Sequence, residues 1–170
     1  MSGPRILVIR LGSMGDVIHA LPAAATLKHS FAGSTLSWVV DARWAPLVGG
    51  NPFVDEVILF RRSLRGLPET WRKLRAGRFT LAVDFQGLIK SALVALVAHP
   101  EHIYGFHQSQ VREKLAALAY SNRVRVNAEH VVEQNLELAT AAGAASLLRV
   151  FPLPEGTAEG ELPAAVASSR

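Results

Sequence analysis

The chain has 170 residues, a length that suits one domain with a single sizeable core. Hydrophobic residues make up 49% and charged residues 19%, which excludes disorder over most of the length. There are no cysteines, so disulfides, thiolate metal sites and a cysteine nucleophile are excluded. A formal net charge of +4 and an isoelectric point near 10 favour an anionic partner, whether nucleic acid, an acidic membrane surface or a phosphorylated substrate.

Two patterns bear on where the protein resides. The N-terminus lacks the charged start, longer apolar region and small-residue cleavage site of a secretory signal. The longest apolar stretch, residues 91–98, is far shorter than the roughly 20 residues that span a bilayer. We therefore expect a cytoplasmic protein.

Short apolar runs rich in β-branched residues alternate with segments of helical periodicity along most of the chain. Strands are expected at residues 5–11, 35–40, 56–60, 81–85, 102–106 and 123–126. Helices are expected at residues 16–28, 42–48, 68–76, 90–98, 112–120 and 130–144. The sequence therefore predicts an α/β fold, a Rossmann-like doubly wound parallel sheet of about five to seven strands that binds ligands at their carboxyl ends.

The alternation ends before the chain does. Residues 1–151 are expected to form the Rossmann-like domain. From residue 152 the sequence loses periodicity and gains Pro, Gly, Ala and Ser, so residues 152–170 are expected to be a linker or a disordered tail.

The first strand-to-helix turn, Gly-Ser-Met-Gly-Asp at residues 12–16, lies where doubly wound proteins bind ligands. Its spacing matches neither the dinucleotide fingerprint nor the phosphate loop, and Asp16 would repel a phosphate there. Asp16 can be a structural acid in the first helical turn, a general base for a substrate hydroxyl, or a group that only binds a hydroxyl. His19, three residues on, would share its helical face, although a lone histidine can also be a packing residue.

Cations are concentrated between residues 61 and 78, where Glu69 is the only acid. Arginine pairs bidentately with carboxylates and phosphates, and Arg61, Arg62 and Arg65 follow an expected strand end, so these three are candidate ligand contacts. The alternatives are a solvated helix face and a surface that rests on anionic headgroups, where each cation contributes roughly 1 kcal/mol.

Polar residues also end the expected strand at residues 81–85 and begin the next helix. Gln86 and Lys90 are candidate acceptor contacts on the same edge as Asp16, whereas Asp84 can simply order the loop. Arg112 begins an expected helix, where a cation is unfavourable to the helix dipole, so a ligand role is attractive there.

Three segments resemble one known family. Residues 5–22, RILVIRLGSMGDVIHALP, closely resemble the opening of the ADP-heptose:lipopolysaccharide heptosyltransferases, with the strongest likeness to the heptosyltransferase I type. Residues 83–92, VDFQGLIKSA, resemble a strand, loop and helix start of that family, and residues 104–120 followed by His130 resemble its arginine-containing segment. The resemblance extends over about residues 4–145.

The resemblance implies the N-terminal, acceptor-binding half of a two-domain glycosyltransferase of the GT-B type. That enzyme would transfer heptose from ADP-heptose to the Kdo-lipid A inner core of lipopolysaccharide, with inversion and without a metal or other cofactor. Asp16 would be its general base. The acceptor contacts would be Ser13, Met14, Gly15, His19, Arg61, Arg62, Arg65, Gln86, Lys90 and Arg112.

The family's C-terminal donor-binding domain has no counterpart in this sequence. We therefore expect the isolated chain to bind acceptor but to transfer poorly, and to meet the anionic inner face of the inner membrane as a peripheral protein. The alternative is a non-catalytic basic module that binds an anionic glycolipid or nucleic acid. For nucleic acid the sequence offers charge but no recognised binding signature, and a nicotinamide enzyme is disfavoured because its fingerprint is absent.

Overall fold

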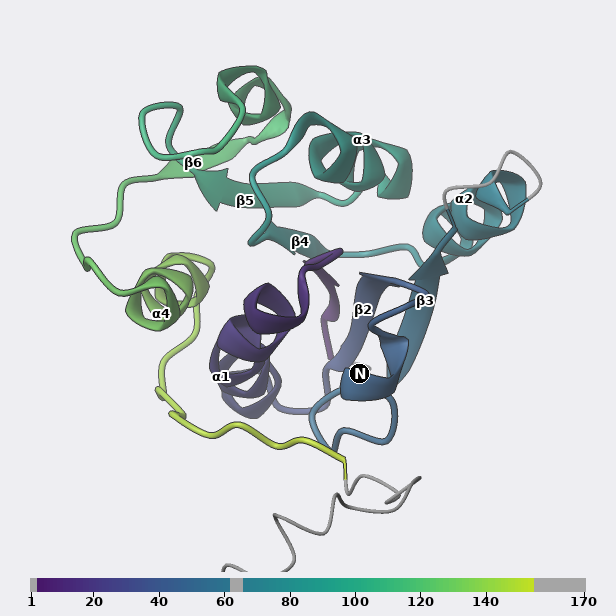
Figure 1. Cartoon of the computed structure of the whole chain (residues 1–170), viewed down its shortest axis with the longest axis horizontal. Coiled ribbons are helices and arrows are strands. Elements are labelled where there is room, and N and C mark those ends of the chain that lie inside the picture. The colour runs from purple at the N-terminus through teal and green to yellow at the C-terminus, as the bar shows by residue number, and fades with distance from the viewer. Residues whose placement is uncertain (1–2, 62–65, 155–170) are drawn as a thin grey trace, which may run out of the picture.

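A single parallel sheet organises the chain. The computed structural model describes residues 3–61 and 66–154, and in these residues six strands run in the order β3-β2-β1-β4-β5-β6 (Figure 1). Every neighbouring pair of strands is parallel. The strands are β1 (Arg5–Ile9), β2 (Thr35–Asp41), β3 (Glu56–Phe60), β4 (Leu81–Asp84), β5 (His102–Phe106) and β6 (Asn122–Val124). The predicted doubly wound, Rossmann-like α/β fold is confirmed.

Helices cover both faces of the sheet. They are α1 (Met14–Ser30), α2 (Leu67–Ala76), α3 (Ile89–Ala98) and α4 (Val131–Ala141), with short 3-10 turns η1 (Ala45–Leu47) and η2 (Lys114–Ala119). The helices α1 and α4 pack together on one face, while α2, α3 and η2 lie on the other (Figure 1). The sheet is therefore the middle of three layers.

The strand β1 shows why these apolar runs become central strands. Its side chains alternate between the two faces: Ile6 and Val8 enter the core beneath α1 and α4, and Leu7 and Ile9 enter the core beneath α3. All four side chains are fully buried. A strand buried on both faces has no polar face, so its sequence is a continuous hydrophobic run.

Two expected helices are much shorter than predicted. The segment 42–48 contains only η1, which includes Pro46 and ends just before two glycines. The segment 112–120 contains only η2, a 3-10 turn of six residues that follows a bend at residues 111–113. Arg112 lies in a bend before η2, so the expectation that it begins a helix was wrong.

The other boundaries differ by a few residues. The helix α1 begins at Met14, earlier than expected, and so contains Pro22 in its interior. Proline has no N–H to donate, so the carbonyl of Ile18 loses its helical partner at that point. The last helix, expected to reach residue 144, ends at Ala141.

An extended segment, residues 142–154, runs from α4 across the surface of α1. The Thr26 hydroxyl accepts from the Leu148 N–H at 2.8 Å, and the Ser30 hydroxyl accepts from the Ser146 N–H at 3.1 Å. Further along, Asn51 donates from its side chain to the Pro152 carbonyl at 2.7 Å. The expected linker or tail begins at the end of this segment, and residues 155–170 lie outside the described part of the chain.

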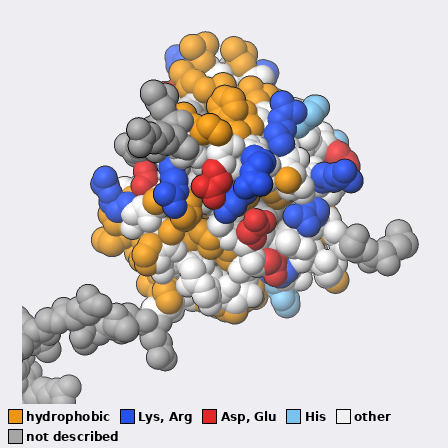
Figure 2. Space-filling view, turned by 90° about the vertical axis from the view of Figure 1, so that its right-hand side faces the viewer, with side chains coloured by type: hydrophobic (Ala, Val, Ile, Leu, Met, Phe, Trp, Pro, Cys, Tyr) orange, Lys and Arg blue, Asp and Glu red, His pale blue; other side chains and the backbone are white. Residues whose placement is uncertain are grey.

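The surface that carries α2 is mixed in charge. Figure 2 shows this side, with Lys and Arg spread across it and Asp and Glu among them, below a cluster of hydrophobic side chains. That cluster belongs to α3 and η2, whose exposed apolar residues are Ile89, Leu93, Leu96, Leu115 and Leu118. Among the described helices, none combines the length and apolar character needed to cross a membrane.

A buried carboxylate joins β4, α3 and the end of η2. Asp84 is fully buried and accepts from the backbone N–H of Gln86 and Gly87, the Ser91 hydroxyl at 2.8 Å and the Tyr120 hydroxyl at 2.7 Å. Burial raises the pKa of Asp84, although each of these four donors acts in the opposite direction. Burial and the neighbouring Asp84 also raise the pKa of Tyr120.

We expect Tyr120→Phe to lower the free energy of unfolding by roughly 1 to 3 kcal/mol, because it removes one donor from a buried carboxyl group. Urea unfolding measures the change. The matched control is Tyr104→Phe, since the Tyr104 hydroxyl makes no hydrogen bond to a described residue and its loss should change stability little. Equal stability of the two variants would contradict the prediction.

Candidate active site

A hollow of about 330 Å³ opens where the chain leaves β1 and β4. From β1 the chain turns into α1 on one face of the sheet, and from β4 it turns into α3 on the other face (Figure 1). Such a switch point leaves a crevice at the carboxyl ends of the strands. The hollow is lined by Leu11, Gly12, Ser13, Asp16, Arg43, Trp44, Gln86, Leu88, Lys90 and Arg112.

Asp16 stands in the first turn of α1, three residues after the N-cap residue Ser13. One carboxylate oxygen, Oδ2, accepts from the Ser13 backbone N–H at 3.1 Å. The side chain is 17% exposed, so it keeps a route to the hollow while its oxygens are held by the protein. The prediction that Asp16 is a first-turn acid is therefore confirmed, and this geometry is compatible with a catalytic role as well.

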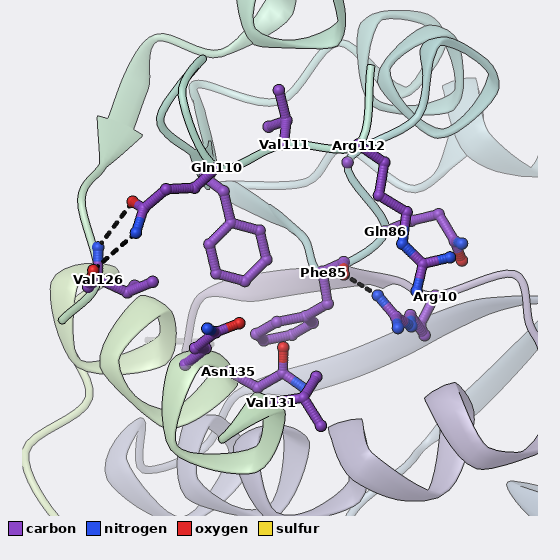
Figure 3. A pocket seen from close by; sticks show the side chains of 12 residues that line it. Arg10, Phe85, Gln86, Gln110, Val111, Arg112, Val126, Val131 and Asn135 are labelled. Carbon is purple, nitrogen blue, oxygen red and sulfur yellow. Dashed lines mark hydrogen bonds between the residues drawn. The ribbon is translucent and has the colours of Figure 1, made fainter. Parts of the chain in front are cut away.

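A buried arginine holds Asp16 from below. Arg10 follows β1 directly, is 3% exposed, and places Nη2 2.7 Å from Asp16 Oδ1. Its Nη1 donates to the Phe85 carbonyl at the end of β4 (Figure 3). Arg10 thus ties the two strand ends at the switch point to the first turn of α1.

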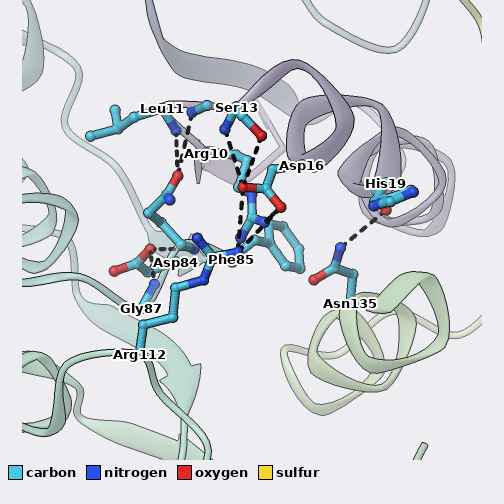
Figure 4. A network of polar contacts seen from close by, with 12 residues as sticks. Arg10, Leu11, Ser13, Asp16, His19, Asp84, Phe85, Gly87, Arg112 and Asn135 are labelled. Carbon is cyan, nitrogen blue, oxygen red and sulfur yellow. Dashed lines mark hydrogen bonds and ion pairs between the residues drawn. The ribbon is translucent and has the colours of Figure 1, made fainter. Parts of the chain in front are cut away.

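A second arginine, Arg112, also reaches Asp16. Arg112 Nη2 lies 3.3 Å from Oδ1 and 3.4 Å from Oδ2 of Asp16 (Figure 4). Its side chain is 57% exposed. The long contact and the exposure mean that Arg112 is loosely held, so it can turn to an incoming anion at little cost.

These neighbours set the protonation state of Asp16. Burial by itself raises its pKa, but the charge of Arg10, the Ser13 N–H and the charge of Arg112 together hold the pKa below its ordinary value of 3.8. Burial lowers the pKa of Arg10, and the charge of Asp16 opposes that effect. Because an arginine stays protonated in proteins, Asp16 is a carboxylate at neutral pH.

Two further predicted residues lie at the same hollow. Gln86 is almost fully buried, and its Oε1 accepts from the backbone N–H of Leu11 at 3.0 Å and of Gly12 at 3.4 Å. It therefore fixes the course of the first turn through Oε1, while its acceptor contact stays a prediction. Lys90 is exposed at the start of α3 and lines the hollow.

Other predicted residues lie around the hollow or away from it. Gly15 faces open space, since apart from its neighbours in α1 no described atom lies within 4 Å of where a Cβ would stand. Met14 is half exposed and does not line the hollow. The His19 ring stacks edge-on against His130 with centroids 6.1 Å apart, so it turns toward α4 and does not contact Asp16 (Figure 4).

Arg61, the described arginine that follows β3, does not line this hollow. Arg61 lies beside α2, where it lines a separate small depression with Glu69 and Lys73. The strand β3 is an edge strand, separated from β1 by β2, and this position keeps Arg61 away from the end of β1. Arg62 and Arg65 lie outside the described residues, so their predicted acceptor contacts stay predictions.

Arg10 and the aromatic wall of the hollow were not among the residues predicted for the site. Arg10 could have been noticed as a charged residue at the end of an otherwise apolar strand. A charge that is buried there needs a partner. Trp44 lies against Gly12, whose Cβ, if present, would stand 2.7 Å from the indole ring. Among the described residues, no cluster of three or more His, Asp or Glu side chains could hold a metal ion.

Solved structures with this fold define the class of protein. The E. coli heptosyltransferase WaaC with ADP matches with a TM-score of 0.76 and 28% sequence identity, over 86% of this chain and 49% of that one. The E. coli ADP-heptose lipopolysaccharide heptosyltransferase II shares the fold, with a TM-score of 0.69 and 24% identity over 91% of this chain and 47% of that one. The chain is thus one Rossmann-like half of a glycosyltransferase fold of the GT-B type.

The chain belongs to glycosyltransferase family 9 (heptosyltransferase), whose sequence model matches residues 68–168. It is 30% identical to lipopolysaccharide heptosyltransferase 1 of Pseudomonas aeruginosa over 167 residues, which cover 91% of this chain and 45% of that protein. It is 31% identical to the same enzyme of Escherichia coli K12, over 79% of this chain and 46% of that protein. The chain therefore spans about half the length of the curated relatives it matches.

The paired Asp16 predicts a pH-dependent stability. Because its folded pKa is depressed, the carboxylate adds stability above its ordinary pKa of 3.8, and this stability is lost as the pH falls through the folded pKa. We expect Asp16→Asn to lower the free energy of unfolding at pH 7 by roughly 1 to 3 kcal/mol, since it leaves a buried guanidinium partly unsatisfied.

The difference between wild type and Asp16→Asn should shrink as the pH falls below 4. Urea unfolding at pH 7 and at pH 3 measures it, and Glu101→Gln, which removes an exposed carboxylate, is the matched control. A difference that stayed constant between the two pH values would show that the charge of Asp16 is not what stabilises the turn.

Proposed function

We propose that this chain is the acceptor-binding half of an inverting heptosyltransferase of lipopolysaccharide biosynthesis, with Asp16 as general base. The donor would be ADP-heptose, the acceptor the Kdo-lipid A inner core, and no separate cofactor would take part. The observation that carries the proposal is an ionised carboxylate at the switch point, open to a hollow that Arg43, Lys90 and Arg112 also line. Family membership and the matches to lipopolysaccharide heptosyltransferases support it.

In the proposed reaction an acceptor hydroxyl binds beside Asp16 in the hollow. Its oxygen attacks the anomeric carbon of heptose, the bond from that carbon to the phosphate oxygen breaks, and ADP leaves with the bonding electron pair. The hydroxyl proton passes to Asp16. Attack from the face opposite the leaving group inverts the configuration.

The low pKa of Asp16 fits a late proton transfer. A carboxylate with a depressed pKa is a weak base toward a free hydroxyl. The acidity of the hydroxyl rises sharply as its oxygen bonds to the anomeric carbon, so the proton can move once that bond is partly formed. Asp16 therefore serves by being ionised and fixed in place, and Arg10 provides both properties.

The surrounding cations suit an acidic acceptor. Kdo carries a carboxylate, and Arg112 and Lys90 stand at the hollow within the reach of a sugar bound next to Asp16. An arginine fork binds a carboxylate bidentately. We assign the acceptor carboxylate to Arg112, which would exchange its long contact with Asp16 for a full ion pair.

Transfer by this chain, joined to the C-terminal half of the E. coli heptosyltransferase 1, tests the role of Asp16. We expect Asp16→Asn to lower the transfer rate by roughly 100-fold or more, the range that general base catalysis contributes. Calorimetric titration with Kdo-lipid A should give a similar affinity for the variant and the wild-type chain.

The control for this test is Glu133→Gln, which removes an exposed carboxylate that pairs with Arg149 and does not line the hollow, and which should leave transfer unchanged. Transfer by Asp16→Asn within tenfold of wild type would rule out the general base. Tight binding of a DNA duplex by the chain, with no response to the glycolipid, would instead favour the non-catalytic basic module.

The acceptor is a lipid, so the proposal includes contact with the membrane surface. The five exposed apolar side chains of α3 and η2 form one cluster with a shallow groove (Figure 2). Lys90 and Lys114 are exposed and follow or precede members of this cluster, Ile89 and Leu115, directly in the sequence. Ile89 belongs to the cluster and the next residue, Lys90, lines the hollow. Apolar residues flanked by lysines suit the interface of an anionic bilayer.

We expect Leu115→Glu with Leu118→Glu to abolish most sedimentation of the chain with phosphatidylglycerol-containing vesicles, because two charges would enter the interface. The matched control is Val150→Glu with Leu153→Glu, which places the same two charges on exposed apolar positions of the segment after α4. Equal loss in both variants would show that net charge, and not the α3 and η2 cluster, governs vesicle binding.

A further inference from the structure

We propose that Glu113 is a positioning residue that holds Arg112 against Asp16. Arg112 belongs to the loop of residues 107–113 between β5 and η2, and its Nη2 lies 3.3 Å and 3.4 Å from the two carboxylate oxygens of Asp16 (Figure 4). The contact is long and the Arg112 side chain is 57% exposed, so the ion pair alone holds it weakly. Only the identity of the anion that Arg112 binds rests on the proposed function.

Arg112 also stands near a second cation. Its charge lowers the pKa of Arg10, because the two guanidinium groups are close enough to repel each other. Arg10 is buried and lies 2.7 Å from Asp16, so the carboxylate already has a strong partner. The attraction that remains for Arg112 is small. The position of its backbone must therefore contribute to keeping Arg112 at the hollow.

Glu113 joins this loop to the turn between β4 and α3 at two points. Its backbone N–H donates to the Gly87 carbonyl at 3.1 Å, and its Oε2 accepts from the Ile89 N–H at 2.6 Å. Ile89 is the first residue of α3, and the N-cap residue Leu88 has no side-chain oxygen that could accept from it. A carboxylate is a favourable acceptor at a helix N-terminus. Glu113 therefore caps α3 from another segment of the chain, and this bond ties that segment to the helix.

The loop is held on the other side of Arg112 as well. Gln110 donates from Nε2 to the Val126 carbonyl at 2.7 Å and accepts at Oε1 from the Val126 N–H at 3.1 Å, as Figure 3 shows. The Arg112 backbone also packs against Gly87, where a Cβ would stand 3.5 Å from the Arg112 nitrogen. The backbone of Arg112 is thus fixed from both sides, and its side chain is the part that can move.

The hold of Glu113 determines where the charge of Arg112 acts. Glu113 follows Arg112 directly in the chain, so a loop released from Ile89 would let Arg112 move away from Asp16. The charge of Arg112 is one of the effects that keep the pKa of Asp16 low, so its departure should raise that pKa. A helix cap without a positioning role would stabilise α3 and leave the pKa of Asp16 unchanged.

Titration of the ¹³C-labelled chain by nuclear magnetic resonance, with the Asp16 carboxyl carbon as reporter, tests this role. We expect Glu113→Ala and Glu113→Asp to raise the pKa of Asp16 by about half or more of the rise that Arg112→Ala causes, because Ala has no acceptor and Asp is one methylene shorter. Glu113→Gln keeps an acceptor oxygen at the same reach and loses the charge, so it should not raise the pKa of Asp16.

The direction of the change separates positioning from a simple charge effect. Loss of a negative charge near Asp16 lowers its pKa, so a rise in Glu113→Ala cannot come from the missing carboxylate itself. In an Arg112→Ala background, Glu113→Ala should cause no further rise, since Glu113 acts through Arg112. The matched control is Glu101→Ala, which removes an exposed carboxylate next to the first residue of β5. Thermal unfolding checks that each variant is folded over the pH range used.

An unchanged or lowered pKa of Asp16 in Glu113→Ala and Glu113→Asp, or an equal rise in Glu113→Gln, would overturn the positioning role. Transfer by the chain joined to the C-terminal half of the E. coli heptosyltransferase 1 gives a second readout. Glu113→Ala should raise the KM for Kdo-lipid A about fivefold or more and change kcat less than about twofold, as expected for lost acceptor binding. A raised pKa of Asp16 with an unchanged KM would support the positioning role and contradict the assignment of the acceptor carboxylate to Arg112.

Discussion

A buried guanidinium next to the switch point constrains the whole site. Arg10 is almost completely buried at the end of β1, and a charge in that position must be paired and hydrogen-bonded. Its two partners come from different elements, the Phe85 carbonyl after β4 and the carboxylate of Asp16 in α1. Satisfying one side chain therefore fixes the positions of two strand ends and a helix relative to each other.

The fold supplies what that pairing needs. Because β1 and β4 are neighbours whose following helices lie on opposite faces, their carboxyl ends diverge and leave a crevice above Arg10. Gln86 closes the crevice from the side by binding the backbone of the first turn, and Asp84 holds the loop that carries Gln86. Asp16 is thus supported by polar contacts from below, from the side and from its own helix.

The strands of the sheet could be predicted because each can be recognised from its own sequence. Runs such as the one at β1 are buried on both faces and so are apolar throughout, which sets them apart from the amphipathic helices between them. Asp16 could also be placed, since its position in a first helical turn depends only on nearby residues. The segment at η2 was predicted to be an α-helix because it is apolar and rich in Ala and Leu, yet it forms a 3-10 turn, which this local pattern does not distinguish from an α-helix.

The rest of the site depends on contacts between distant residues. The partner of Arg10 at Phe85 lies 75 positions away, and nothing local to Arg10 indicates it. His19 has the spacing to share a face with Asp16, yet it turns to His130, which only the packing of α4 on α1 brings near. Arg61 follows a strand as expected, but the order of strands, which local pattern does not encode, places β3 at the sheet edge.

The two arginines hold Asp16 with unequal strength, and this difference bears on when Asp16 becomes a stronger base. Arg10 is buried and close, so it stays with the carboxylate throughout, whereas Arg112 is exposed and makes only long contacts. An anionic substrate that draws Arg112 away removes one of the charges that depress the pKa of Asp16. The pKa of the carboxylate would then rise when an acceptor is bound. The substrate itself would thereby make Asp16 a stronger base for the proton that it receives.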